Sequence, residues 1–371
     1  MNPKETSKVV LLSGDDERQS WNTFVTHSRW GHALQSWEWG EFKQSMGWHA
    51  VRISIQRGGQ ILAGEQLLLK PLPSLPLTIA YLPKGPVVDL TDEPLTQKLF
   101  TAIHQVARGH QAIFLKIEPN LLDDDGAHGL LKRYGFTPTV HTNQPRSTIV
   151  IDLAEQRDVL FGNMRNTTRK LIQRASRNGV QIDRGGSSDL DALYEMMAAA
   201  AKRKGHSIHE KRFYQQEWHA FQATDSIHLL VARYQGKVVA VKMVLVFADT
   251  SMHLWGGVSA TGRRVYANHL LQWAAIQWAM ENGCTYCDLW GIPDQVGEML
   301  KADQAIPKAR YDGLWGTYMF KRGFGGNVVY YVGAYDYAYR TRLYWLGMNL
   351  LVRNRSVSQV SGWMERLFGG L

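Results

Sequence analysis

The sequence predicts an α+β protein in which two similarly built domains, each with a mixed sheet, follow one another along the chain. Three observations support this fold class. The chain has 371 residues, which is more than one ordinary hydrophobic core accommodates. Its 44% hydrophobic and 20% charged content is typical of a folded protein. Strand-like and helix-like patterns also recur in the same order in each half.

Each half begins its repeated pattern with two strands joined by a glycine-containing turn. Alternating apolar residues and β-branched side chains predict these pairs over residues 49–72 in the first half and 227–247 in the second. A third strand follows each pair, over residues 77–85 and 251–257. Both halves therefore open with the same three-strand arrangement.

A helix and a further strand follow the third strand in each half. Apolar residues recur at helical spacing over Leu95–Ala107 and His269–Met280. Each of these helices ends at a glycine-containing turn, and the next strands are predicted over 112–119 and 286–293.

Each half then ends in a similar way. A segment that finishes in a Gly-Phe turn occurs at 132–136 and at 321–325, and a β-branched or aromatic strand closes each half, over 146–153 and 327–336. Because any α+β chain can be divided so that it looks repeated, the case for duplication rests on the shared order of these features. That order favours duplication.

The order strand–strand–strand–helix–strand–helix–strand resembles that of the acyl-CoA N-acetyltransferase (GNAT) fold. We expect two tandem units of this kind with a cleft between them, a common place for ligand sites. Enzymes of this fold that use coenzyme A hold its pyrophosphate with a Q/R-x-x-G-x-G/A loop before the helix. Neither 83–94 nor 256–268 fits that pattern, which disfavours acetyl-CoA as the acyl donor.

Charge and cysteine content narrow the possible partners. The net charge of +9 favours an anionic partner such as a nucleic acid, a nucleotide sugar or an anionic membrane surface. Cys284 and Cys287 lie in an apolar strand pattern, so we interpret them as buried structural thiols and not as a redox pair or half a zinc site. No other metal-ligand cluster has convincing spacing.

The sequence also bears on where the protein works. Its first residues lack the apolar core of a signal peptide, and no apolar stretch is long enough to span a membrane. We therefore expect a cytoplasmic protein.

Five segments carry a further signal, in order along the chain: 35–48, 81–89, 163–180, 269–292 and 316–326. Together they resemble the Fem family (FemABX) of peptidoglycan bridge-forming aminoacyltransferases. The resemblance implies transfer of Gly, Ala or Ser from aminoacyl-tRNA to a side-chain amine in the stem peptide of a UDP-linked or lipid-linked precursor, without a cofactor. It also implies a precursor-binding domain over 1–148 plus about 328–371, and an aminoacyl-tRNA domain over 149–327.

The resemblance assigns roles to three charged residues of the first domain. Lys43 falls near the family's contact to nucleotide-sugar phosphates, for which a lysine is chemically suited, although it could be a solvated helix lysine. Lys84 lies in the family's Tyr-x-x-Lys-Gly-Pro segment and is a further candidate for substrate binding. Glu118 matches a candidate general base, and its alternatives are pairing with Lys116 or capping a turn.

In the second domain, the family's Phe-Lys pair falls on Phe320 and Lys321, beside the charged end of the tRNA and the reacting ester. Lys321 would stabilise the oxyanion or the phosphate of the terminal adenosine, and Phe320 would stack on adenine. The alternative is a core phenylalanine beside a surface lysine. Tyr81 and Trp255, on the two third strands, would line the substrate site unless they serve only core packing.

His209 departs from the family pattern, because it aligns roughly with an arginine that grips phosphate. A neutral histidine donates one hydrogen bond where arginine offers a fork of five N–H groups. Lys211 or Arg212 could supply the charge instead.

A basic helix is predicted at the start of the second domain, with no acidic residue between Val159 and Ile182. Such a face suits tRNA phosphates, although it could be only a solvated surface. Its candidate tRNA-binding residues are Arg165, Arg169, Lys170, Arg174 and Arg177.

The end of the chain, residues 343–371, could form an amphipathic helix that contacts the membrane or packs against the protein. Two further functions compete with aminoacyl transfer. One is an N-acyltransferase that uses acyl-CoA or another carrier, and the other is a non-catalytic protein that binds tRNA or the precursor.

Overall fold

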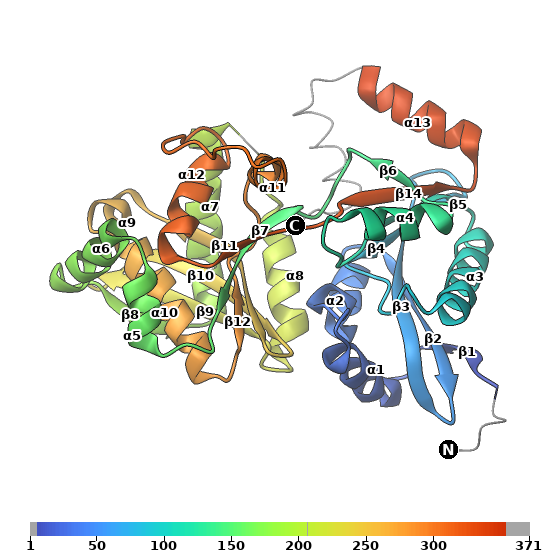
Figure 1. The fold of residues 1–371 in the computed structure, drawn as a ribbon. Coiled ribbons are helices and arrows are strands. Elements are labelled where there is room, and N and C mark those ends of the chain that lie inside the picture. The colour runs from blue at the N-terminus through green and yellow to red at the C-terminus, as the bar shows by residue number, and fades with distance from the viewer. Residues whose placement is uncertain (1–5, 206, 354–371) are drawn as a thin grey trace. The chain divides into compact units, whose positions relative to one another are not determined.

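A computed structural model describes residues 6–205 and 207–353, which form two compact units (Figure 1). Unit 1 holds the described residues up to Gln144 together with those from Tyr331 onward, and unit 2 is Pro145–Tyr330. Each unit is built on one seven-stranded sheet with helices packed against it. The predicted fold class, two tandem GNAT-like units of mixed α+β structure, is confirmed.

Sheet 1, in unit 1, has the strand order β1-β2-β3-β4-β5-β14-β6. All neighbours are antiparallel except β4 and β5, which are parallel. The strands are β1 Lys8–Leu12, β2 His49–Arg57, β3 Gln60–Pro71, β4 Thr78–Pro83, β5 Ala112–Glu118, β6 Thr137–Thr139 and β14 Ala334–Ala338.

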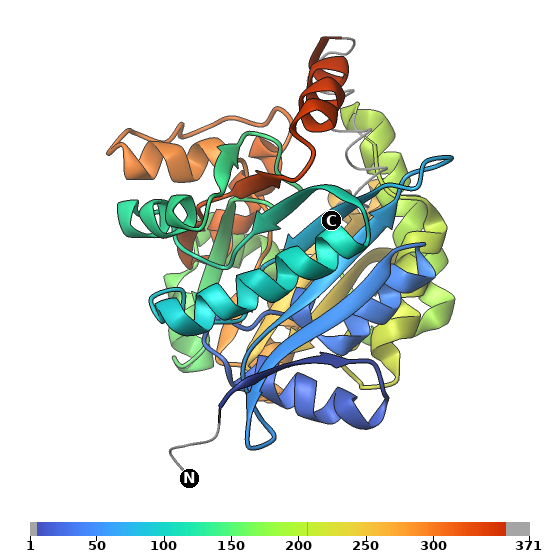
Figure 2. The same cartoon turned by 90° about the vertical axis from the view of Figure 1, so that its right-hand side faces the viewer.

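The main helix of unit 1 is α3, Glu93–Gly109, which lies across the strands of sheet 1 (Figure 2). Its apolar face, centred on Leu99 and Ile103, is buried against β2 and β3. Asp92 caps the start of α3 by accepting a hydrogen bond from the backbone N–H of Leu95. The other helices of the unit are α1 Asp16–His27, α2 Trp37–Ser45, α4 Asp125–Arg133 and α13 Thr341–Arg353.

Sheet 2, in unit 2, has the strand order β13-β7-β12-β11-β10-β9-β8, and its only parallel neighbours within the described residues are β11 and β12. The strands are β7 Ser147–Asp152, β8 Gln181–Gly185, β9 Ile227–Tyr234, β10 Lys237–Phe247, β11 Thr250–Val258, β12 Tyr286–Asp288 and β13 Asn327–Tyr330. The helices are α5 Arg157–Asn163, α6 Asn166–Arg177, α7 Leu190–Lys204, α8 Lys211–Gln222, α9 Ala260–Arg264, α10 Ala267–Glu281, α11 Asp294–Lys301 and α12 Trp315–Lys321.

The closing strands differ from the prediction. Strand β7, expected to close the first half, pairs with β12 and β13 in sheet 2. The segment 327–336, expected as one strand, contains β13 and β14, because the chain turns at Gly333, whose φ of 83° suits glycine. Strand β14 then enters sheet 1 between β5 and β6. Sheet 2 thus takes a strand that was predicted for the first half, and sheet 1 takes one that was predicted for the second.

The remaining predicted strands and helices occur where they were expected, with ends that differ by a few residues. Strand β12 is the exception, since it ends at Asp288 instead of reaching 293. Cys284 and Cys287 are both buried, as predicted, and they do not form a disulfide. Among residues 6–205 and 207–353, no helix is long and apolar enough to cross a bilayer.

Candidate functional site

Sheet 2 opens between β11 and β12, and the candidate site lies at this opening. The two strands pair only from Thr250 to Met252 on β11, whereas β11 continues to Val258. Strand β12 stops because the carboxylate of Asp288 accepts the backbone N–H of Trp290 at 2.7 Å, and Trp290 adopts a left-handed φ of 64°. Beyond this turn the two strands are no longer neighbours.

A β-bulge in β11 directs its side chains to different helices. The pairing of β11 with β10 shifts register, so that β11 carries one extra residue between Met252 and Trp255. His253 accepts a hydrogen bond at Nδ1 from Nε2 of Gln272 on α10, at 2.7 Å. Trp255 donates from Nε1 to Oε2 of Glu217 on α8, at 2.6 Å. The bulge thus places a histidine and a tryptophan at the same opening.

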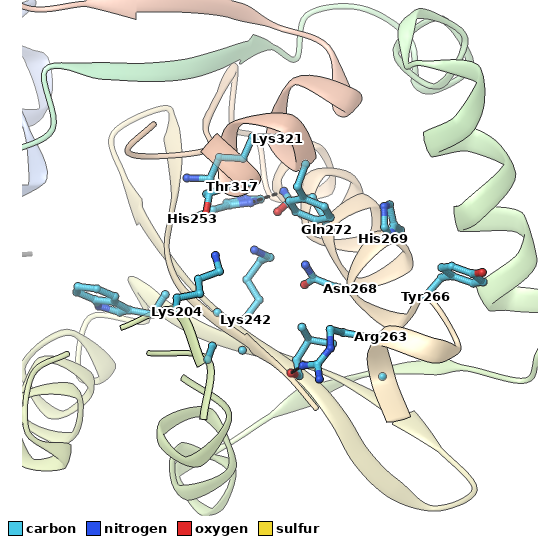
Figure 3. Close-up of a pocket in the computed structure, with 18 of the residues that line it drawn as sticks. Lys204, Lys242, His253, Arg263, Tyr266, Asn268, His269, Gln272, Thr317 and Lys321 are labelled. Atoms are coloured by element: carbon cyan, nitrogen blue, oxygen red, sulfur yellow. Dashed lines mark hydrogen bonds between the residues drawn. The ribbon is translucent and has the colours of Figure 1, made fainter. Parts of the chain in front are cut away.

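A cavity of about 540 Å³ occupies the opening (Figure 3). Its lining comes from β10, β11, α9, α10 and α12, from the middle of α6 and from the end of α7. No Asp or Glu is among its lining residues in the described part of the chain, but five basic residues are: Arg203, Lys204, Lys242, Arg263 and Lys321. A cavity with this charge fits an anionic ligand.

Lys321, at the end of α12, lies at this cavity and is held by the turn that ends β12. Its Nζ donates to the backbone oxygens of Trp290 at 2.9 Å and Gly291 at 2.8 Å. Burial and the nearby charge of Lys242 lower the pKa of Lys321 to about 7, against the opposing effect of Asp288. Near neutral pH the amine therefore exists in both protonation states. Lys321 is partly exposed, and its two hydrogen bonds hold the amine at the cavity.

Lys242, in the middle of β10, was missed by sequence reasoning. Its side chain is 8% exposed and faces the cavity (Figure 3). Within the described residues its ammonium has no hydrogen-bond or ion-pair partner. Burial lowers its pKa to about 8, partly offset by Cys287. A lone charged residue inside the apolar run of β10 was the available signal.

His253 and Cys287, which lie beside the two lysines, are uncharged near neutral pH. Burial and the charge of Lys242 hold the pKa of His253 well below its ordinary value. Burial raises the pKa of the Cys287 thiol to about 12. The two lysines therefore contribute the titrating charge at the floor of the cavity.

Phe320 lines the cavity together with aromatic neighbours. Its ring centroid lies 5.1 Å from that of His269 and 5.1 Å from that of Phe324. Burial lowers the pKa of His269 to about 4, so the ring is neutral. Phe320 both borders the hydrophobic core and faces the cavity, which leaves an aromatic surface for a planar ligand group.

The basic helix was predicted correctly as α6, and it adjoins the cavity. Leu171 of α6 lines the cavity, and the guanidinium of Arg174 lies 5.0 Å from the ring centroid of Tyr266, another lining residue. Arg165, Lys170, Arg174 and Arg177 are exposed. Arg169 is partly buried and donates to the backbone oxygen of Gly162 at 2.6 Å.

In unit 1, Tyr81 and Glu118 form a buried pair. Tyr81 donates to Oε2 of Glu118 at 2.5 Å, and Oε1 accepts the backbone N–H groups of Asn143 at 2.5 Å and Gln144 at 3.1 Å. Glu118 therefore caps the turn at 143–144. Burial raises the pKa of its carboxyl, against the charge of Lys116.

The alternative that Glu118 pairs with Lys116 is wrong. The ammonium of Lys116 lies 2.9 Å from Oδ1 of Asp336 on β14, and it also donates to the backbone oxygen of His141. Both side chains of this ion pair are almost fully buried.

The two other lysine candidates of unit 1 contact aromatic rings. Lys43 is 2% exposed, and its ammonium lies 4.9 Å from the Trp39 ring centroid, so the alternative of a solvated lysine is wrong. Lys84 is also buried, with its ammonium 3.5 Å from the ring centroid of Tyr331. Contacts of this kind stabilise a cation that is withdrawn from water.

His209 lies in the loop before α8 and stacks on Phe213, with ring centroids 4.0 Å apart. Its ring is also 6.1 Å from that of Trp255, which lines the cavity. Of the predicted site residues, Trp255, Phe320 and Lys321 line the cavity. His209 does not line it but contacts Trp255, which does. Tyr81, Lys84 and Glu118 gather in unit 1.

The position in unit 1 that corresponds to Lys242 is occupied by an acidic residue, Glu65. Lys242 follows the glycine turn before β10 at the same interval as Glu65 follows the turn before β3. Glu65 is fully buried, and burial raises its pKa well above the ordinary value. A Cβ added to Gly85 would lie 2.2 Å from Oε2 of Glu65. The loop after β4 therefore packs directly against the carboxyl of Glu65 and fills the space beside it. Unit 1 thus lacks the cationic floor of unit 2.

Both halves of the chain match models of known protein families. The model of the FemAB family matches residues 17–128, and a model described as an acetyltransferase (GNAT) domain matches residues 162–298. Lipid II:glycine glycyltransferase of Staphylococcus aureus strain MRSA252 is 24% identical over 403 aligned residues, covering 88% of this chain and 93% of that protein.

Solved structures share the arrangement of both units. The crystal structure of FemX has a TM-score of 0.78 at 20% identity, and the match covers 91% of this chain and 99% of that one. A tandem GNAT protein from the clavulanic acid biosynthesis pathway has a TM-score of 0.53 at 12% identity, covering 90% and 98%. These similarities show the tandem GNAT fold.

Proposed function

Because the chain belongs to the FemABX family of aminoacyltransferases, we propose that it adds an amino acid to a peptidoglycan precursor during formation of the interpeptide bridge. The acceptor is a side-chain amine in the stem peptide of the precursor. Similarity to enzymes named lipid II:glycine glycyltransferase favours a lipid-linked precursor over a UDP-linked one.

The donor in this proposal is an aminoacyl-tRNA that carries a small residue, Gly, Ala or Ser. The observation that carries the proposal is the cationic cavity of unit 2, which has five basic side chains and adjoins the basic helix α6. The cavity would hold the esterified terminal adenosine, and α6 would contact backbone phosphates nearby. A phosphate-rich donor fits this continuous basic surface.

Lys321 and Phe320 occupy the donor end of the proposed site. Attack of a neutral amine on an aminoacyl ester needs close placement of the two groups and stabilisation of the developing oxyanion. Lys321 places its amine at this end of the cavity, and Phe320 stacks on adenine.

The acceptor binds unit 1 in this proposal, where Lys43 and Lys84 contribute buried positive charge. Tyr81 would position Glu118, whose role as a general base stays a prediction. His209 and Trp255 contribute an aromatic and weakly basic border in unit 2.

Helix α13 provides the proposed contact with a membrane that carries the acceptor. Tyr344 faces the protein, because its hydroxyl donates to Asp336 at 2.9 Å and its ring packs on Phe114. Leu343, Trp345 and Leu346 are 38%, 59% and 56% exposed. An apolar face with tryptophan suits the bilayer interface. The rest of the predicted contact, residues 354–371, lies outside the described part of the chain.

The proposal is tested by transfer of radiolabelled amino acids from a panel of charged tRNAs to purified precursor, in both UDP-linked and lipid-linked forms. Product is expected with at least one of glycine, alanine or serine. Binding of acetyl-CoA at low micromolar affinity, without transfer from any charged tRNA, would instead support the acyl-CoA-dependent enzyme. Binding of charged tRNA without product would support a non-catalytic protein.

Reversing charge on α6 is expected to weaken tRNA binding. Arg169→Glu combined with Arg174→Glu removes two cations from the proposed phosphate contact, so the salt dependence of binding should flatten by about two in log–log slope. Filter binding at several salt concentrations measures this slope. The control is Arg57→Glu at the end of β2, and an unchanged slope in the α6 variant would make that helix a solvated face.

Replacing Lys43 with alanine is expected to raise the precursor concentration needed for half-maximal transfer by about tenfold, because one phosphate contact is lost. The maximal rate should change little. Steady-state transfer at varied precursor concentration measures both values, with Lys8→Ala on the edge strand β1 as control. An unaltered half-maximal concentration would remove Lys43 from the precursor site.

A further inference from the structure

Lys242 is the least compensated charge at the cavity of unit 2. It is 8% exposed, it faces the cavity, and no described residue gives its ammonium a hydrogen bond or ion pair. A buried unpaired ammonium destabilises a folded protein, because the lost hydration is not replaced. Lys242 therefore destabilises the fold and at the same time faces a cavity. Both properties are typical of a residue that interacts with a ligand.

The amine of Lys321, unlike that of Lys242, has hydrogen-bond partners in the protein. Two backbone carbonyls accept hydrogen bonds from its Nζ. In the neutral amine both N–H bonds serve these carbonyls, and the lone pair is directed away from them. Lys321 can therefore accept and return a proton at the position that points away from these carbonyls, whereas the ammonium of Lys242 has no described hydrogen-bond partner.

Resting on the proposed function, we propose that Lys242 is a catalytic residue whose ammonium stabilises the oxyanion formed on the aminoacyl ester, while neutral Lys321 accepts the proton of the attacking amine. The charge on Lys242 also favours the neutral form of Lys321. In this proposal one lysine stabilises the oxyanion and the other accepts the proton, at the same ester.

The reaction balances with these two groups. The acceptor nitrogen bonds to the ester carbon, the carbonyl electron pair moves onto oxygen beside Lys242, and the amine proton moves to Nζ of Lys321. The intermediate then re-forms the C=O bond and breaks the bond to the ribose oxygen. That oxygen takes the proton from Lys321, leaving an amide and a free ribose hydroxyl.

The charged and titratable groups that face Lys242 support this assignment. They are Cys287 from β12, His253 from β11 and Lys321 from α12, and the exposed Arg203 and Lys204 of α7 and Arg263 of α9 line the same cavity. Cys287 and His253 are neutral near pH 7, and the carboxylate of Asp288 is occupied by Thr148 and the N–H of Trp290. The cation of Lys242 is therefore left for the ligand.

The test measures single-turnover transfer from charged tRNA with wild-type protein and with Lys242→Met, which keeps most of the side-chain length and removes the charge. The transfer rate constant is expected to fall about 100-fold, with the half-saturating concentration of charged tRNA changed less than about twofold. Lys242→Arg should restore at least about a tenth of the wild-type rate. The control is Lys237→Met, an exposed lysine on the same strand.

Two further readouts separate catalysis from a structural role. The wild-type rate is expected to rise with pH near 7, as Lys321 loses its proton, and to fall above about 8, as Lys242 does. Lys242→Met should lose the falling limb. It should also raise Tm by roughly 2–4 °C below pH 8, where the wild-type ammonium is charged, and the gain should shrink above pH 8.

The outcomes are distinguishable. If wild-type protein transfers no amino acid, the proposed function fails. If wild type transfers and Lys242→Met keeps more than about a third of its rate, the role of Lys242 is overturned. A lower Tm in Lys242→Met would also overturn it, because a structural lysine loses stability when replaced.

Discussion

Replacing Lys321 with methionine is expected to lower the rate constant of aminoacyl transfer by about 1,000-fold, while the dissociation constant of the precursor changes less than about twofold. The amine is held by Trp290 and Gly291 at the end of the cavity, and its pKa of about 7 allows it to accept and return a proton near neutral pH. Methionine keeps most of the length of the side chain and removes this capacity.

Rapid-quench transfer from charged tRNA measures the rate constant, and titration of a labelled precursor measures binding. Lys308→Met is the matched control, because Lys308 is exposed and does not line the cavity. Equal losses in transfer and in precursor binding would contradict a role confined to the chemical step. A transfer rate within about threefold of wild type would exclude Lys321 from that step.

Asp336→Ala is expected to reduce the free energy of unfolding by about 3–5 kcal/mol, because it leaves the ammonium of Lys116 buried without its partner. The ion pair joins β5 and β14, the returning strand, with Nζ and Oδ1 2.9 Å apart. Lys116 is 1% exposed, so water does not replace the lost carboxylate.

Urea unfolding followed by tryptophan fluorescence measures this loss. The double variant Lys116→Met with Asp336→Leu is the control, since it removes both charges and is expected to recover most of the stability. A loss below about 1 kcal/mol in Asp336→Ala would mean that the pair behaves like a surface ion pair. A double variant no more stable than the single one would mean that packing, and not the unpaired charge, causes the loss.

Local periodicity was enough to predict most of the strands and helices. The paired strands β2–β3 and β9–β10 alternate in polarity and are joined by glycine turns, so neighbours in sequence are also neighbours in the sheet. The partners of β7 and β14 are not local. A β-branched strand such as β7 satisfies either sheet equally well, and only tertiary packing decides its place.

The candidate site was predictable in part for the same reason. Phe320 and Lys321 lie in a segment that resembles a family motif, and the cavity brings them together with Trp255. Lys242 carries no motif, and its importance depends on the early end of β12. The early end of β12 depends on a turn at Trp290, which has a positive φ. This turn could not be predicted from the sequence, because tryptophan rarely adopts a positive φ.

The return of the chain to sheet 1 at β14 has a consequence for the order in which the protein is made. Synthesis begins with unit 1, but β14 is added only after all of unit 2 has been synthesised. Unit 2 is one continuous segment, so its sheet can close while the ribosome is still translating. Until β14 emerges, β5 and β6 lack the strand that separates them and expose open edges. The unit that is started first is therefore the last to be completed.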